Sequence, residues 1–139
     1  MAGICLLVAT LPAQQSPTMA ALQDELTRSM AELRMSGEPA PYYIAYEVLD
    51  RTISDYSGRL GALVENPPRH TRTLRVEVRV GDYAFDSSRF VTQGFGGGGG
   101  LSGETVIAPV DDDYDAMRRQ IWITTDSAYK RAISMFARK

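Results

Sequence analysis

Two long stretches of the chain repeat their apolar residues with the period of an amphipathic helix. In the first stretch the apolar residues recur every three or four positions and share one helical face: Met19, Leu22, Leu26, Met30 and Leu33. Ser16 and Pro17 supply an N-cap and a first-turn proline, and Gly37 supplies a stop signal. The pattern predicts a helix over residues 17–36.

The second helical stretch begins at the acidic residues 111–115 and continues to residue 139. Its apolar face is unusually broad. The face is made of Met117, Ile121, Thr124, Ala128, Ala132 and Met135, widened by Trp122, Tyr129, Ile133 and Phe136. A face of this width needs a sheet or a second partner to cover it.

Between the two helical stretches the residues alternate as they do in β-strands. Residues 41–50 place aromatic and β-branched side chains on one face, and residues 71–80 alternate leucine and valine with threonine and charged residues. We expect residues 51–64 to return as the antiparallel partner of residues 41–50, and residues 83–90 to add a short extended segment. The predicted fold is α+β: a helix, an antiparallel sheet of three or four strands, and a long C-terminal helix packed on the sheet.

Two segments stand outside this pattern. Residues 4–10 are an apolar run followed by Pro12 and Ala13, which is typical of the end of a secretory signal peptide. We therefore expect residues 1–15 to be a signal-peptide remnant, residues 16–139 to form one domain, and the protein to be secreted or periplasmic. Residues 94–103 carry seven glycines in ten positions, which predicts a mobile loop. A phosphate-binding loop is disfavoured because no Gly-Lys-Ser/Thr ending leads into a helix.

Charge argues against a nucleic-acid partner. The net charge is −2 and the sequence pI is about 5.4, so the chain has no overall attraction to a phosphate backbone. Tyr42, Tyr43, Tyr46 and Tyr56 could form a stacking surface for bases, but strand tyrosines more often pack across a sheet. The row Arg75, Glu77 and Arg79 is a solvated face or the rim of an interface.

The inventory of reactive side chains limits the chemistry available to this chain. It has one histidine, His70, and one cysteine, Cys5, whereas a zinc site draws three or four ligands mainly from these residue types. His70 lies in a polar stretch with turn character, which favours a solvated loop histidine over a catalytic base. We assign no catalytic, cofactor-binding or metal-binding residue. A hydrolase that uses only a pair of carboxylates stays open.

The acidic residues 111–115 invite comparison with a calcium loop. Asp111, Asp113 and Asp115 stand at alternate positions, as at the start of an EF-hand, but no glycine follows at the sixth position and Trp122 occupies the twelfth. Carboxylates in the first turn of a helix are explained by capping and by the helix dipole. We predict that this cluster caps the C-terminal helix.

Four ordered blocks resemble the amino-terminal region of TldD/PmbA-type metallopeptidases, in particular a secreted, TldD-related branch. They are residues 38–46 (EPAPYYIAY), 60–64 (LGALV), 74–83 (LRVEVRVGDY) and 111–119 (DDDYDAMRR). The resemblance covers residues 19–139. It implies an amino-terminal α/β domain that precedes a mostly β domain carrying a zinc-binding His-Glu-x-x-x-His helix. No residue of this chain matches that helix.

The resemblance implies a function for the parent protein. Relatives hydrolyse small or unfolded peptides with a zinc-activated water, and they pair subunits around an inner cavity. The chain is then expected to be a non-catalytic fragment, whose partners are its own carboxyl-terminal domain and a homologous subunit, and which makes no stable membrane span. Zinc is expected only in the carboxyl-terminal domain. The alternative is a free-standing periplasmic interaction or dimerisation module without enzymatic activity.

Overall fold

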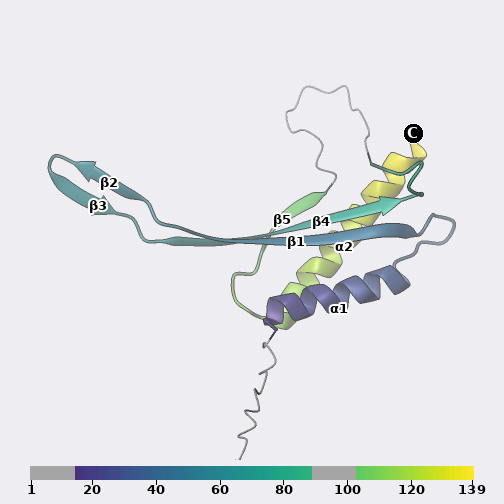
Figure 1. Ribbon diagram of the computed structural model, residues 1–139, viewed down its shortest axis with the longest axis horizontal. Coiled ribbons are helices and arrows are strands. Elements are labelled where there is room, and N and C mark those ends of the chain that lie inside the picture. The colour runs from purple at the N-terminus through teal and green to yellow at the C-terminus, as the bar shows by residue number, and fades with distance from the viewer. Residues whose placement is uncertain (1–14, 89–102) are drawn as a thin grey trace, which may run out of the picture.

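The computed structural model describes residues 15–88 and 103–139 (Figure 1). The signal-like run, Cys5, residues 89–90 of the expected extended segment and nearly all of the glycine run lie outside these ranges. The elements in chain order are α1 (Pro17–Glu32), β1 (Pro41–Ile53), β2 (Tyr56–Arg59), β3 (Ala62–Glu65), β4 (Arg69–Val80), β5 (Glu104–Ala108) and α2 (Tyr114–Ala137).

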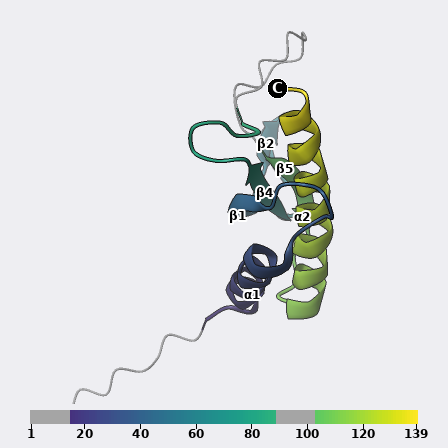
Figure 2. The same cartoon turned by 90° about the vertical axis from the view of Figure 1, so that its right-hand side faces the viewer.

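The main sheet has three antiparallel strands in the order β1-β4-β5. Both helices cover the same face of this sheet, and no helix of the described residues lies on its other face (Figure 2). The core lies between the sheet and the helices, where Leu74, Val76 and Val80 of β4 meet Met117 and Ile121 of α2. The predicted α+β fold, with a long C-terminal helix packed on an antiparallel sheet, is confirmed.

Local sequence explains where both helices begin. The Ser16 hydroxyl accepts a hydrogen bond from the Met19 backbone N–H, and the Asp113 carboxylate accepts one from the Ala116 N–H. Such N-caps satisfy backbone donors that have no partner within the helix. The prediction that the acidic cluster caps the C-terminal helix is therefore confirmed. The predicted end of the first helix at residue 36 is wrong, because Leu33 is already extended.

The predicted stripe is wrong in part for α1 and mostly confirmed for α2. In α1 the buried residues are Ala21, Leu22, Glu25 and Ser29, whereas the predicted stripe residues Met19 and Met30 are exposed. In α2 the predicted residues Met117, Ile121, Thr124, Ala128, Tyr129 and Ala132 are buried. Trp122, which was predicted to widen this stripe, is 53% exposed.

The predicted partner of β1 is wrong. The strand runs past Asp50 without a bend and pairs with β4 from Tyr43 opposite Arg79 to Ile53 opposite Arg69. Residues 56–65 instead form their own hairpin, β2–β3. The long pairing of β1 with β4 is favoured because it places the apolar residues of both strands opposite one another on the face that the helices cover. Val78 opposite Ile44 is one such pair.

The expected extended segment at residues 83–90 is also wrong over its described part. Residues 83–88 follow a turn in which the Asp82 carboxylate accepts hydrogen bonds from the Ala84 and Phe85 N–H groups. The third strand is β5, which pairs with Arg72 to Val76 of β4. An aspartate that binds the backbone two residues on favours a turn over a strand.

A two-stranded arm projects from the body of the domain (Figure 1). We define the arm as residues 51–71, the part of the β1–β4 ladder beyond the reach of β5, together with the β2–β3 hairpin at its end. Every residue of the arm is exposed.

Among the described helices, none is long and apolar enough to cross a membrane.

Candidate functional site

His70 lies at the start of β4, where the arm leaves the sheet, and not in the expected loop. Its Nε2 atom contacts the Asp50 carboxylate, and its side chain is 45% exposed, so its predicted exposure is confirmed. Hydrogen bonds from Arg72 and then from His70 hold the pKa of Asp50 below its ordinary value. No hydroxyl within the described ranges hydrogen bonds to His70, so the structure assembles no nucleophile–base pair around it.

Arg72 is the most connected side chain at this end of the sheet. It is 6% exposed. Two nitrogen atoms of its guanidinium, Nε and Nη2, donate hydrogen bonds to Asp50 Oδ2, at 2.8 and 2.6 Å. Its other acceptors are the Thr18 hydroxyl, the Asp112 carboxylate and the carbonyl oxygens of Pro109 and Asp111. Arg72 thus ties the start of α1 and the loop before α2 to the sheet.

The acidic residues 111–115 before α2 have structural roles in this part of the fold. Asp113 caps the helix, Asp115 lies in its first turn, and Asp112 pairs with Arg72 at 3.1 Å. Within residues 15–88 and 103–139, no three His, Cys, Asp or Glu side chains gather in a way that could hold a metal ion.

The four tyrosines do not form one stacking surface. Tyr42 donates a hydrogen bond to Asp86 at 2.6 Å, and the Arg79 guanidinium lies 4.8 Å from the centre of the Tyr43 ring. Tyr46 instead turns toward the helices, where its hydroxyl meets hydroxyl groups of α1 and α2. Tyr56 lies far away on the arm. The prediction that these tyrosines pack across the sheet is confirmed for Tyr43, whose ring meets its cross-strand partner Arg79, whereas Tyr42 contacts the turn after β4 and Tyr46 contacts the helices.

The sheet face opposite the helices, which we call the open face, carries the predicted charged row. Arg75 pairs with Glu47 of β1 at 3.4 Å, and Arg79 pairs with Glu77 at 2.6 Å. Arg75, Glu77 and Arg79 lie on the face without helices, and their side chains are 15–35% exposed. The row is therefore partly buried, and the solvated face and the rim of an interface both stay predictions. Paired surface charges of this kind contribute little to stability.

An apolar row crosses the open face beside these charges. Leu49 of β1 is opposite Thr73 of β4, and Thr73 is opposite Ile107 of β5. Leu49 is 43% exposed and Ile107 is 81% exposed. Ile53 continues the same face of β1 into the arm, because residues at every second position of a strand point the same way. This row could not be predicted from the sequence pattern alone.

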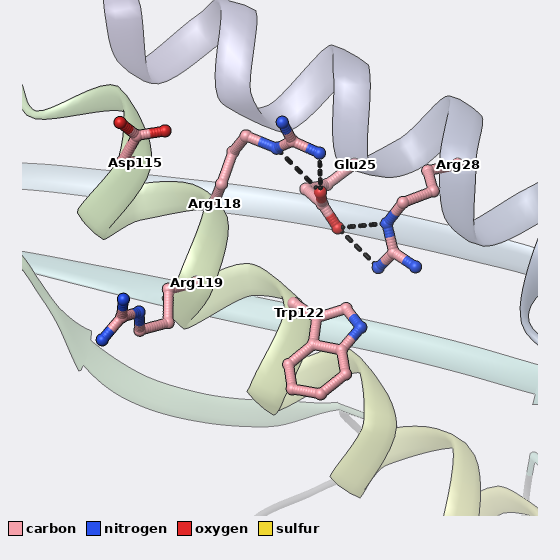
Figure 3. Close-up of a pocket in the computed structure, with 6 residues that line it drawn as sticks. All are labelled: Glu25, Arg28, Asp115, Arg118, Arg119 and Trp122. Carbon is pink, nitrogen blue, oxygen red and sulfur yellow. Dashed lines mark hydrogen bonds and ion pairs between the residues drawn. The ribbon is translucent and has the colours of Figure 1, made fainter.

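A buried carboxylate links the two helices (Figure 3). Glu25 of α1 is 2% exposed, and its two carboxylate oxygens accept hydrogen bonds from Arg28 and from Arg118 of α2. Burial by itself would raise the pKa of Glu25, but the hydrogen bonds and charges of the two arginines outweigh it and lower the pKa. We call these three residues the helix triad.

A shallow hollow of about 360 Å³ lies beside the helix triad and is lined in addition by Asp115, Arg119 and Trp122 (Figure 3). Both oxygens of Glu25 are occupied by arginine, and the carboxylate does not face into open space as a general base would. The hollow is therefore the outer surface of a helix–helix contact.

Comparison with known proteins adds no assignment, since no protein-family model, curated protein or solved structure matches the chain. Sequence reasoning missed Glu25 and Arg72 as well as the apolar row. A signal existed for both charged residues. Arg72 has the same strand parity as the buried Leu74 and Val76, and Glu25 lies between Leu22 and Leu26 on the apolar side of its helix.

Proposed function

We propose that this chain is the non-catalytic amino-terminal domain of a TldD/PmbA-like zinc metallopeptidase that degrades small or unfolded peptides. Its role is assembly: the open face packs against the carboxyl-terminal domain of the parent protein. The apolar row of Leu49, Thr73 and Ile107 is the observation that carries this proposal.

Exposure and register support an assembly role for the row. Antiparallel sheets commonly leave one face in water, and that face is then polar. On the open face, Arg75, Glu77 and Arg79 are polar, as this rule expects. Ile107 does not follow the rule, because it is apolar and most of its side chain is exposed to water. An apolar row bordered by paired charges has the arrangement of an interface centre with a polar rim.

The chemistry of the parent is assigned outside this chain. A zinc ion in such a peptidase supplies an activated water and polarises the peptide carbonyl. The described side chains do not gather into a zinc site, and Asp50, Asp112 and Glu25 are each engaged by arginine. The domain would accordingly position the zinc domain and a homologous subunit, without touching the reacting atoms.

The same row also suits the alternative, a free-standing dimerisation module. The two proposals differ in the partner that covers Ile107. A stable homodimer of this chain at micromolar concentration, measured by sedimentation, would favour the module. A chain that is monomeric alone and forms a one-to-one complex with the carboxyl-terminal domain would favour the peptidase.

Replacing Ile107 by lysine should weaken the complex with the carboxyl-terminal domain by about tenfold or more, because a charge would enter an apolar contact. Calorimetric titration of the two separately produced domains measures this. The matched control is Ile123→Lys, since Ile123 is 49% exposed on α2. Equal effects of the two substitutions, or an effect of Ile123→Lys alone, would place the interface elsewhere.

A further inference from the structure

The turn at the end of the arm holds a leucine in a conformation that leucine rarely adopts. Leu60 has a φ of 51°, and no other non-glycine residue within the described ranges has a positive φ. Gly61 follows with a φ of 79°. Two consecutive positive φ angles make the two-residue hairpin turn in which Asn-Gly is preferred. A leucine there is unfavourable for the turn itself, and its side chain is 100% exposed.

The end of the arm exposes an apolar side chain on each of its two faces. Leu63 is 75% exposed and Val64 is 45% exposed. These two residues are consecutive in β3, so they point to opposite faces of the ribbon. With Leu60 at the turn, apolar side chains cover the tip and both faces. A groove on a protein would cover only one face of such a ribbon, whereas lipid surrounds all of it.

Charge at this end has one sign. Among residues 57–64 the only charged side chain is Arg59, although the whole chain has a net charge of −2. Tyr56 and Glu65 form the cross-strand pair just behind this segment. Aromatic and arginine side chains are favoured at the boundary between lipid tails and headgroups, where arginine reaches the phosphates. The first carboxylate therefore lies just outside the segment that would enter the lipid.

The arm is built to hold this end away from the body. Arg69 forms an ion pair with Asp55 at 3.0 Å, and the Asn66 N–H donates to the Asp55 carbonyl at 3.1 Å, so the hairpin is braced where it joins the long ladder. Figure 1 shows the β2–β3 hairpin at the far end of the long axis of the molecule. Among the described elements, only β2 and β3 themselves pack against each other at this end.

We propose that residues 57–64 insert shallowly into an anionic lipid membrane. Leu60 at the turn enters deepest, Leu63 and Val64 follow behind it, and the long Arg59 side chain, whose backbone lies next to the turn opposite Ala62, reaches back to the headgroup phosphates. This site is separate from the apolar row of the open face and does not depend on the assembly role. It would attach the protein to a membrane surface peripherally, without a span.

Replacing Leu60 by asparagine separates binding from folding, because asparagine favours this turn. Wild type should sediment with vesicles made of equal parts of phosphatidylcholine and phosphatidylglycerol, and less with phosphatidylcholine alone. Leu60→Asn should reduce the partition by about tenfold or more while leaving the melting temperature equal or higher. The matched control Ile123→Asn, an exposed apolar residue of α2 that lies outside both proposed binding surfaces, should bind as wild type does.

A fluorescence measurement gives a second readout. In the variant Leu60→Trp with Trp122→Phe, the emission should shift to shorter wavelength on adding anionic vesicles, whereas in wild type Trp122 on α2 should not shift. If wild-type protein does not sediment with the anionic vesicles, the proposal is overturned. So would a change of oligomeric state caused by Leu60→Asn in the absence of lipid, because the tip would then bind protein.

Discussion

Replacing Arg28 and Arg118 together by methionine should lower the free energy of unfolding by about 3–5 kcal/mol, because it strands a buried carboxylate without a partner. Glu25 is 2% exposed, so water cannot replace the lost hydrogen bonds without opening the contact between α1 and α2. Urea unfolding followed by circular dichroism measures the change. Adding Glu25→Leu to the double variant should restore most of the loss, since three apolar side chains can pack where a charged triad was.

The helix triad also predicts a dependence on pH. The pKa of Glu25 is lowered below its ordinary value of 4.5 in the folded protein, so its contribution to stability is complete above pH 4.5 and is lost as the pH falls through the folded value. In the double arginine variant burial raises the pKa of Glu25 instead, so stability should fall as the pH rises. If the double variant keeps wild-type stability, or if Glu25→Leu does not rescue it, Glu25 is not buried as the structure shows.

Replacing Arg72 by methionine should cost about 3 kcal/mol, because the buried guanidinium joins two carboxylates, a hydroxyl and two backbone carbonyl groups. The matched control is Arg75→Met on the same strand, three residues further on. Arg75 pairs across the open face with an exposed glutamate, so its loss should change the free energy of unfolding by less than about 1 kcal/mol.

The loss of structural stability caused by Arg72→Met should be confined to one end of the domain. Hydrogen exchange of the amides at the start of α1 and in the loop before α2 should accelerate more than exchange in the centre of β4. Arg72→Met and Arg75→Met with equal effects on stability would contradict the difference in burial between the two faces of β4.

The sequence predicted those elements whose local pattern agrees with their tertiary surroundings. The alternation of residues 71–80 gave β4, and the capping residues Ser16 and Asp113 gave the helix starts. The partner of β1 could not be predicted, because pairing depends on which ladder covers the helices and not on the nearest downstream segment. The strand β5 has only five residues and directly follows the glycine-rich stretch, so its own sequence pattern is too weak to predict it.

The candidate sites show a similar division. Capping by the residues before α2 follows from local chemistry and was predicted, whereas the helix triad joins residues that are far apart in sequence. The apolar row likewise depends on register: Leu49 and Ile107 become neighbours of Thr73 only after β1 and β5 pair with β4. A single sequence carries no direct signal for that juxtaposition.

The central proposal places the zinc chemistry in a domain that follows this chain. It joins the resemblance of residues 38–46, 60–64, 74–83 and 111–119 to an apolar row that suits a second domain. The most direct measurement is to sequence the DNA that follows the codon for Lys139. The account predicts a reading frame, in phase or after a shift, that encodes a His-Glu-x-x-x-His helix. A genuine stop codon followed by unrelated sequence in all three frames would contradict it.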